Sequence, residues 1–224
     1  MQPLHRNRRG CPPSHPKAGT EDRPYVVDNM REIGNLIDER ELEKLAERYG
    51  PFERRRYTLM MGEGEFAYWR EKLARDRRGE VVLAIRDADG RVLLHSKDFY
   101  PAGIYRLPSG GVRWGEDILS AARREAREET GLEIEVERLL GVLEYEFRCG
   151  EETMPFVSYV FLVREVGGRL IPQDAGERIA SFRRVPPSEL PKVAASLRAL
   201  TGEWRDWGRF RALAHDFVGE VLGG

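Results

Sequence analysis

The amino-acid sequence predicts a mixed α+β fold, an α/β sandwich that carries a helical extension on its N-terminal side. Apolar runs with a strand-like pattern recur between residues 80 and 185. One strong amphipathic helix pattern, at about residues 116–130, lies between these runs, and further helical patterns precede and follow them. Strands on both sides of one helix, with more helix at the end of the chain, are typical of a sheet covered by helices.

Composition sets the first limits on function. Of the 224 residues, 41% are hydrophobic and 33% are charged, which favours a packed core over global disorder. We expect neither a membrane span nor a secretory signal, because no apolar run reaches about 18 residues and none follows the basic residues near the N-terminus. The net charge of −1 predicts no nucleic-acid partner. Two cysteines, Cys11 and Cys149, favour a reducing, cytoplasmic setting.

The chain divides into four parts. Residues 1–24 contain five prolines and almost no large apolar side chains, so they are expected to form a disordered tail. Residues 25–78 are interpreted as a helical extension, and residues 79–190 as the main domain. Residues 191–224 are expected to form C-terminal helices that pack on this domain or on a partner subunit.

Two helices are expected in the extension. Asp38 followed by Glu41 is a capping-box pattern, and Gly50-Pro51 is a stop signal, so the first helix is predicted over residues 39–49. The second is predicted over residues 65–78. Large apolar side chains recur on one of its faces: Phe66, Trp69 and Leu73.

The main domain starts with two strand-like runs, residues 81–85 and 92–94, on either side of a hairpin-turn signal at residues 87–90. Further strands are predicted at residues 139–148, 155–165 and 181–185. After Pro186-Pro187 the pattern is helical again, as far as residue 200 and then from about residue 203 to 222.

The helix predicted at residues 116–130 carries the candidate chemistry. Glu125, Glu128 and Glu129 stand at i, i+3 and i+4 and therefore share one helix face, at the edge of a narrow apolar stripe. Crowded carboxylates raise one another's pKa, and a hard divalent cation such as Mg²⁺ or Mn²⁺ removes that conflict. Such a cation also binds phosphate oxygens and activates water, which suggests hydrolysis at phosphorus. Three glutamates alone are also compatible with a solvated acidic helix face paired with arginines.

The spacing of the whole segment favours the first interpretation. Residues 110–132 resemble the Nudix box, in which a glycine and a glutamate precede Arg-Glu-apolar-any-Glu-Glu-any-Gly-apolar at fixed distances. A match by chance at every position is negligible for this composition. The matching residues are Gly110, Glu116, Arg124, Glu125, Ala126, Glu128, Glu129, Gly131 and Leu132.

This resemblance implies a Nudix hydrolase, with a mixed sheet between helices and the box as a loop–helix–loop. The family cleaves nucleoside diphosphates linked to another moiety and uses Mg²⁺ or Mn²⁺. One of the box glutamates is expected to orient the attacking water, and Arg124 matches a structural partner of the box carboxylates. The metal ligands that the resemblance implies are Glu125, Glu128, Glu129, Glu116 and the carbonyl of Gly110 or Gly111.

Residues outside the box give weaker signals than the box itself. Glu177 lies in a loop, from which many Nudix enzymes supply a general base, although loop glutamates are usually only solvated. Arg106 is equally well placed to meet a substrate phosphate or a carboxylate at the sheet edge. The four histidines show no ligand spacing and are interpreted as incidental. Aromatic residues at helical spacing near the C-terminus predict packing or a homodimer face: Trp204, Trp207, Phe210 and Phe217.

Two other functions remain open at this point. One is a Nudix-fold regulator that senses a nucleotide without catalysis, and another is an isomerase or mRNA-decapping relative on the same fold. The intact box opposes the first of these. The substrate is expected to be a small nucleotide. The first proline after the box is Pro155, 23 residues past Leu132, which weakens an assignment to ADP-ribose without excluding it.

Overall fold

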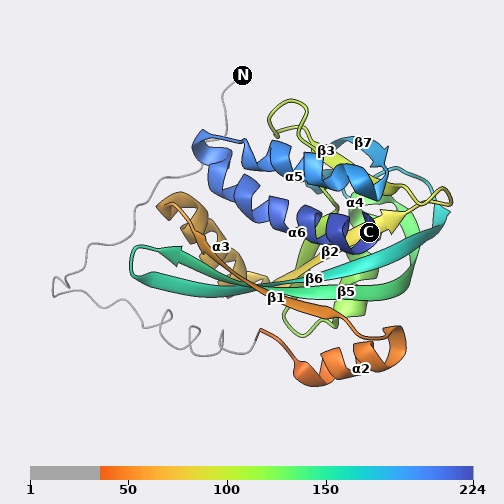
Figure 1. Ribbon diagram of the computed structural model, residues 1–224, viewed down its shortest axis with the longest axis horizontal. Coiled ribbons are helices and arrows are strands. Elements are labelled where there is room, and N and C mark those ends of the chain that lie inside the picture. Colours follow the sequence, from red (N-terminus) through yellow and green to blue (C-terminus); the bar gives the residue numbers. More distant parts are fainter. Residues whose placement is uncertain (1–35, 224) are drawn as a thin grey trace.

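A computed structural model describes residues 36–223 (Figure 1). Within this range, seven strands form one mixed sheet in the order β1-β5-β6-β2-β3-β7, and β4 pairs with β2 outside that path. The strands are β1 (Glu53–Met60), β2 (Arg77–Arg86), β3 (Val92–Lys97), β4 (Ser109–Arg113), β5 (Leu132–Cys149), β6 (Glu152–Gly168) and β7 (Ile179–Val185). The helices are α2 (Glu39–Tyr49), α3 (Glu63–Arg75), α4 (Ile118–Thr130), α5 (Leu190–Arg198) and α6 (Arg205–Gly223).

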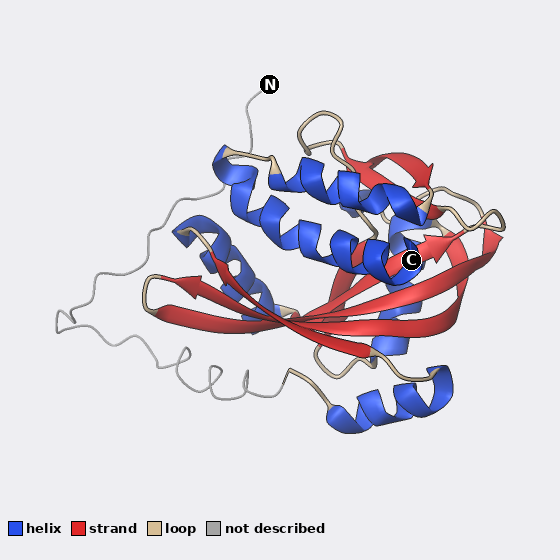
Figure 2. Ribbon diagram, in the orientation of Figure 1, coloured by secondary structure: helices blue, strands red, loops and turns tan. Residues whose placement is uncertain are grey.

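The centre of the sheet is built from its most apolar strands. β2 runs parallel to β6, and residues 81–85 in it are fully buried between the two helix layers. A continuous apolar run is the pattern expected of a strand that is covered on both faces. The long strands β5 and β6 form an antiparallel pair beside it, and the sheet twists strongly along them (Figure 2).

Helices cover both faces of the sheet, as the sandwich prediction requires (Figure 1). On one face α2 adjoins the start of α4, where the Glu41 carboxylate accepts a hydrogen bond from the Ile118 amide at 2.6 Å. On the other face α3 lies beside α6, with the rings of Trp69 and Phe210 5.2 Å apart. α5 packs on α6.

The aromatic stripes of α3 and α6 are covered inside the chain. Trp69 packs edge-on against Phe156 and Phe210, and Phe210 also contacts Phe147. Phe217 is fully buried as well. Burying each large side chain is worth about 1.5–3 kcal/mol. The sequence left open whether these stripes pack on the chain's own domain or on a second subunit. In the structure they pack within the chain.

Two strands were not predicted, and the end of one helix was misplaced. Residues 53–60 form strand β1, parallel to β5, inside the segment interpreted as purely helical. Its outward arginines hid the alternation of half-buried residues, and two of them, Arg54 and Arg56, pair with Glu144 on β5. The helix predicted to reach residue 78 ends at Arg75, because Arg77 already belongs to β2. Strand β4 was not predicted.

Most of the remaining elements match their predictions to within a few residues, and α2 matches fully, but β5 starts at Leu132 instead of residue 139. Asp38 caps α2 by accepting hydrogen bonds from the Arg40 and Glu41 amides. The tail predicted at residues 1–24 and residues 25–35 of the extension lie outside the described residues. In the described part of the chain, no helix is long and apolar enough to cross a membrane.

Candidate active site

The box adopts a strand–loop–helix–loop conformation. Strand β4 leads into a loop, and Asp117 starts α4 by accepting a hydrogen bond from the Ser120 amide. Gly131 ends α4 with a φ of 73°, in the left-handed region that favours glycine. A Cβ at this position would also lie 2.1 Å from the Ile171 carbonyl oxygen. Conformation and close packing therefore both require glycine there.

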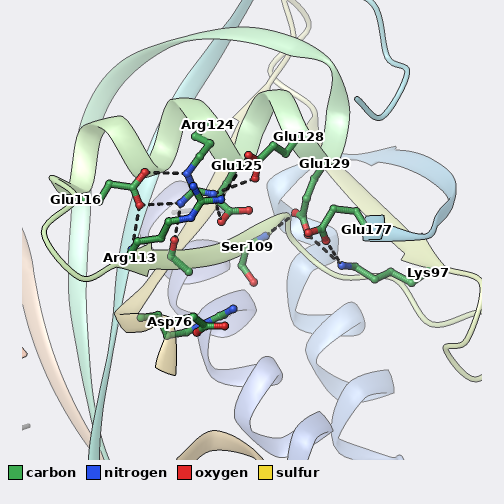
Figure 3. A network of polar contacts seen from close by, with 12 residues as sticks. Asp76, Lys97, Ser109, Arg113, Glu116, Arg124, Glu125, Glu128, Glu129 and Glu177 are labelled. Atoms are coloured by element: carbon green, nitrogen blue, oxygen red, sulfur yellow. Dashed lines mark hydrogen bonds and ion pairs between the residues drawn. The ribbon is translucent and has the colours of Figure 1, made fainter. Parts of the chain in front are cut away.

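Arg124 gathers the carboxylates on one side of the box (Figure 3). Its Nε and Nη2 donate to Glu116, each at 2.8 Å. Its Nη1 donates to Glu125 at 2.6 Å and to Glu128 at 3.0 Å. Its Nη2 also donates to the Gly111 carbonyl at 2.7 Å. One guanidinium thus holds three carboxylates, and these four side chains together remain negative.

Burial disturbs the ionisation of Glu125. It is 6% exposed, and burial raises its pKa to about 7, helped by the charges of Glu129 and Glu128 and opposed by Arg124. Burial therefore outweighs the like-charge repulsion that the sequence suggested as the cause. Gly110 makes room for this carboxylate, because a Cβ there would lie 1.8 Å from its Cδ. Glycine at position 110 is thus a requirement of the Glu125 side chain.

Glu129 lies apart from the other two helix glutamates. It is 1% exposed and accepts a hydrogen bond from the Ser109 amide at 3.0 Å. Two cations approach it, Lys97 at 3.3 Å and Arg106 at 3.5 Å. Burial raises its pKa although both cations act in the opposite direction. The box glutamates therefore divide into an Arg124 group and a Glu129 group.

Glu177 belongs to the second group. It ends a short 3-10 turn, Ala175–Glu177, and Lys97 donates to it at 2.5 Å. Burial raises the pKa of Glu177, but the hydrogen bond and charge of Lys97 more than offset this and lower it overall. The amides of Gln173 and Asp174 bond the Glu128 carbonyl, which attaches this loop to the end of α4. The loop glutamate chosen from sequence thus reaches the box.

Arg106 is 4% exposed and lies in the wall of the site. Its Nε donates to the Tyr100 hydroxyl at 2.7 Å, and its Nη1 donates to the Leu107 carbonyl and the Ser109 hydroxyl. Its Nη2 lies 3.5 Å from Glu129. Of the two partners that the sequence left open, the structure shows the carboxylate.

His215 has a structural role that the sequence did not predict. Burial, supported by the charges of Arg106 and Arg211, lowers its pKa to about 3, so the ring is neutral. Its Nε2 accepts a hydrogen bond from the Leu107 amide at 2.9 Å, and its Nδ1 lies 2.8 Å from the Arg211 carbonyl. The ring therefore carries its proton on Nδ1 and ties α6 to the segment before β4. His5 and His15 lie outside the described residues.

A pocket of about 310 Å³ opens beside Glu125. The sequence did not indicate that its lining residues form one site, because they come from α3, β2, β3, β4, α6 and loops and meet only in the fold. Cations and aromatic rings dominate its lining, which includes Tyr68, Lys72, Arg77, Lys97, Phe99, Tyr100, Arg106, Trp204, Trp207 and Arg211. Sequence patterns had indicated packing or a dimer face for Trp204 and Trp207, and either a phosphate or a carboxylate as the partner of Arg106.

The residues fit a hard divalent cation in their chemistry. The side chains around Arg124 offer only carboxylate oxygens, which Mg²⁺ and Mn²⁺ prefer. A nearby cation would also favour the ionised form of Glu125, which burial disfavours. As they stand, no three His, Cys, Asp or Glu side chains among residues 36–223 lie close enough to hold a metal ion. Glu125 and Glu128 would have to exchange contacts with Arg124 for the metal.

Comparison with known proteins agrees with this geometry. The NUDIX domain family matches residues 76–207, which contain the box, the pocket strands and the start of α6. The chain belongs to the Nudix hydrolase family. It is 32% identical over 128 residues to an ADP-ribose pyrophosphatase of Methanocaldococcus jannaschii, a match that covers 57% of this chain and 73% of that protein.

Other relatives and solved structures match this Nudix protein over different lengths. A human 8-oxo-dGDP phosphatase is 39% identical over 93 residues, which are 40% of this chain and 26% of that protein. Among solved structures, a NUDIX hydrolase from Nitrosomonas europaea aligns with a TM-score of 0.44 at 20% identity, over 64% of this chain and 88% of that one. A UDP-X diphosphatase aligns with a TM-score of 0.41 at 16% identity, over 82% and 72%.

Proposed function

We propose that this Nudix protein hydrolyses a pyrophosphate bond in a nucleoside diphosphate linked to another moiety, with water activated by Mg²⁺ or Mn²⁺. The observation that carries the proposal is the position of Glu125, which belongs to the cluster of box glutamates around Arg124 and lines a pocket of cations and aromatic rings. Cations suit phosphate groups, and aromatic rings suit a nucleobase. The names of the two relatives, ADP-ribose pyrophosphatase and 8-oxo-dGDP phosphatase, fit the same class of substrate.

The metal would be held by oxygen ligands from the box: Glu125, Glu128, Glu129, Glu116 and the carbonyl of Gly110. When bound, such a cation polarises phosphate oxygens and lowers the pKa of a coordinated water. Arg124 keeps Glu116, Glu125 and Glu128 together between turnovers through the contacts given above. It contributes no charge to the substrate, because its donors are directed at these carboxylates and at Gly111.

Glu177 is proposed as the general base. Its lowered pKa keeps the carboxylate ionised near neutral pH, so it is able to accept a proton from water. Its loop is anchored to the end of α4 and its carboxylate contacts Lys97, which also approaches Glu129. Lys97 would therefore hold the base beside the box. Arg106 is proposed to act on the substrate side indirectly, by fixing the pocket wall and Glu129, because its donors already bond protein groups.

The test is a panel of nucleoside diphosphate derivatives, incubated with Mg²⁺, Mn²⁺ or EDTA, with products identified by mass. Glu125→Gln, Glu128→Gln and Glu129→Gln should each lower turnover by orders of magnitude. Glu135→Gln is the matched control, because Glu135 is exposed on β5 and pairs with Arg164 far from the pocket lining. Full activity in the three box variants, or equal activity in EDTA, would overturn the proposal. Nucleotide binding with no product would favour the sensing alternative.

Homodimerisation and a cytoplasmic location stay predictions. The aromatic stripes that suggested a dimer are buried within the chain, so they no longer support it.

A further inference from the structure

The pocket beside the box is lined by more cations than the box chemistry uses. Acidic residues in its lining are Glu80, Glu125 and Glu177. The cations are Lys72, Arg77, Lys97, Arg106 and Arg211. An excess of positive charge in a concave site attracts an anion, provided that the cations are not already satisfied by carboxylates. The partners of each cation therefore decide where a substrate anion binds.

Three of the five cations are paired deep in the wall. Arg211 donates through Nη1 to both oxygens of Glu80, at 2.7 and 2.9 Å, and both side chains are nearly buried. Lys97 bridges two carboxylates. Arg106 donates to the hydroxyls of Tyr100 and Ser109 and to the Leu107 carbonyl. These cations stabilise the wall and have little charge left over for a ligand.

Lys72 and Arg77 differ from the other three. Both bond to the same carboxylate, Asp76: the Arg77 Nε donates at 2.7 Å and the Lys72 Nζ at 3.3 Å. Two cations thus share one anion at the end of α3. Among the described residues, the hydrogen bond found for Arg77 uses Nε alone, which leaves the Nη1 and Nη2 fork for another partner.

Arg77 also lies close to the reaction centre. Its guanidinium packs over Gly111, where a Cβ would lie 2.8 Å from Cζ and from Nε. Gly111 follows Gly110, which makes room for the Glu125 carboxylate. The Gly111 carbonyl accepts a hydrogen bond from Arg124. Figure 3 shows Asp76 below the glutamate cluster, on the side away from α4. The Lys72 side chain is about one-third exposed and Arg77 about one-fifth, so both are accessible from solvent.

We propose that Lys72 and Arg77 form an anion subsite that binds the phosphate oxygens of the substrate next to the box. This subsite rests on the proposed function. Within that function, Lys72 and Arg77 would determine the specificity of the protein for diphosphates, although both lie outside the box. The Arg77 fork suits bidentate contact with two phosphate oxygens, and Lys72 adds a point charge at the mouth of the pocket. α3 would thereby supply part of the substrate site.

The variants Arg77→Gln and Lys72→Met test this subsite, and Arg77→Lys separates charge from fork geometry. Arg75→Gln is the matched control, because Arg75 is on the same helix, is largely exposed and pairs with Glu71. Binding of inorganic pyrophosphate is measured by calorimetry without divalent metal, and KM and kcat are measured on the best substrate of the panel. Thermal melting checks that each variant is folded.

Arg77→Gln is expected to weaken pyrophosphate binding at least tenfold and to raise KM at least tenfold, with a smaller change in kcat. Arg77→Lys should recover part of the affinity, and Arg75→Gln should match the wild type. Unchanged pyrophosphate binding and unchanged KM in folded Arg77→Gln would overturn the subsite while leaving hydrolysis intact. If the wild type hydrolyses nothing but binds pyrophosphate in an Arg77-dependent way, the subsite stands and the proposed function fails.

Discussion

The buried carboxylate of Glu125 predicts a specific pH dependence of stability in the metal-free protein. Burial raises the pKa of Glu125 from its usual 4.5 to about 7 in the folded state. The folded protein therefore binds more protons than the unfolded chain between these two pH values. Stability contributed by the protonated form is fully present below pH 4.5 and is lost as the pH rises through about 7.

The magnitude follows from the same pKa difference. At 1.36 kcal/mol per pKa unit, the change from 4.5 to about 7 corresponds to a loss of about 3 kcal/mol, of which about 2–3 kcal/mol falls between roughly pH 5 and pH 8. Glu125→Gln replaces the carboxyl with a neutral group of the same shape and removes this dependence. The variant is therefore expected to be more stable than the wild type at pH 8 and to converge with it at pH 5.

The assay is urea denaturation in EDTA at several pH values, with the difference in unfolding free energy taken between variant and wild type. Taking the difference cancels the titration of groups that do not interact with Glu125. Glu71→Gln is the control, because this exposed glutamate on α3 pairs with Arg75, so its curve should run parallel to that of the wild type. A curve for Glu125→Gln that also stays parallel would refute the reasoning.

Divalent metal supplies a second arm of the same experiment. At pH 8, saturating Mg²⁺ should stabilise the wild type by about 2.7 kcal/mol when its concentration is 100 times the Kd. Glu125→Gln should gain much less, because it lacks the ionised oxygen ligand. Equal stabilisation of both proteins would show that Glu125 does not hold the metal.

Three further predictions follow. Gly110→Ala should abolish turnover with little change in melting temperature, because the new Cβ would displace the flexible end of Glu125 rather than backbone; activity assays and thermal melting check this. A chain that starts at Tyr25 should fold and turn over substrate like the full chain, since the composition of residues 1–24 does not support a core; circular dichroism and kinetics decide. Light scattering at micromolar concentration tests the predicted homodimer, and a mass near 25.8 kDa would reject it.

The sequence determined the elements whose patterns are local. Helix α2 was predictable because the cap at Asp38 and the stop at Gly50 act within one turn of the helix. The box glutamates were predictable because their spacing of three and four residues places them on one helix face. Strand β1 was missed, since three consecutive arginines in it are stabilised by carboxylates on distant elements, such as Glu144.

Only the tertiary structure decided how the charged groups of the site are divided. The i, i+4 relation of Glu125 and Glu129 suggests one shared centre, yet the first faces Arg124 and the second faces Lys97 and Arg106. The sequence could not show this, because Lys97 and Arg106 lie outside α4 and meet Glu129 only after the sheet has formed. Burial likewise sets the pKa of Glu125, and burial is a property of the packed chain. Local spacing thus fixes which side chains share a face, and the charges brought by other elements decide what that face binds.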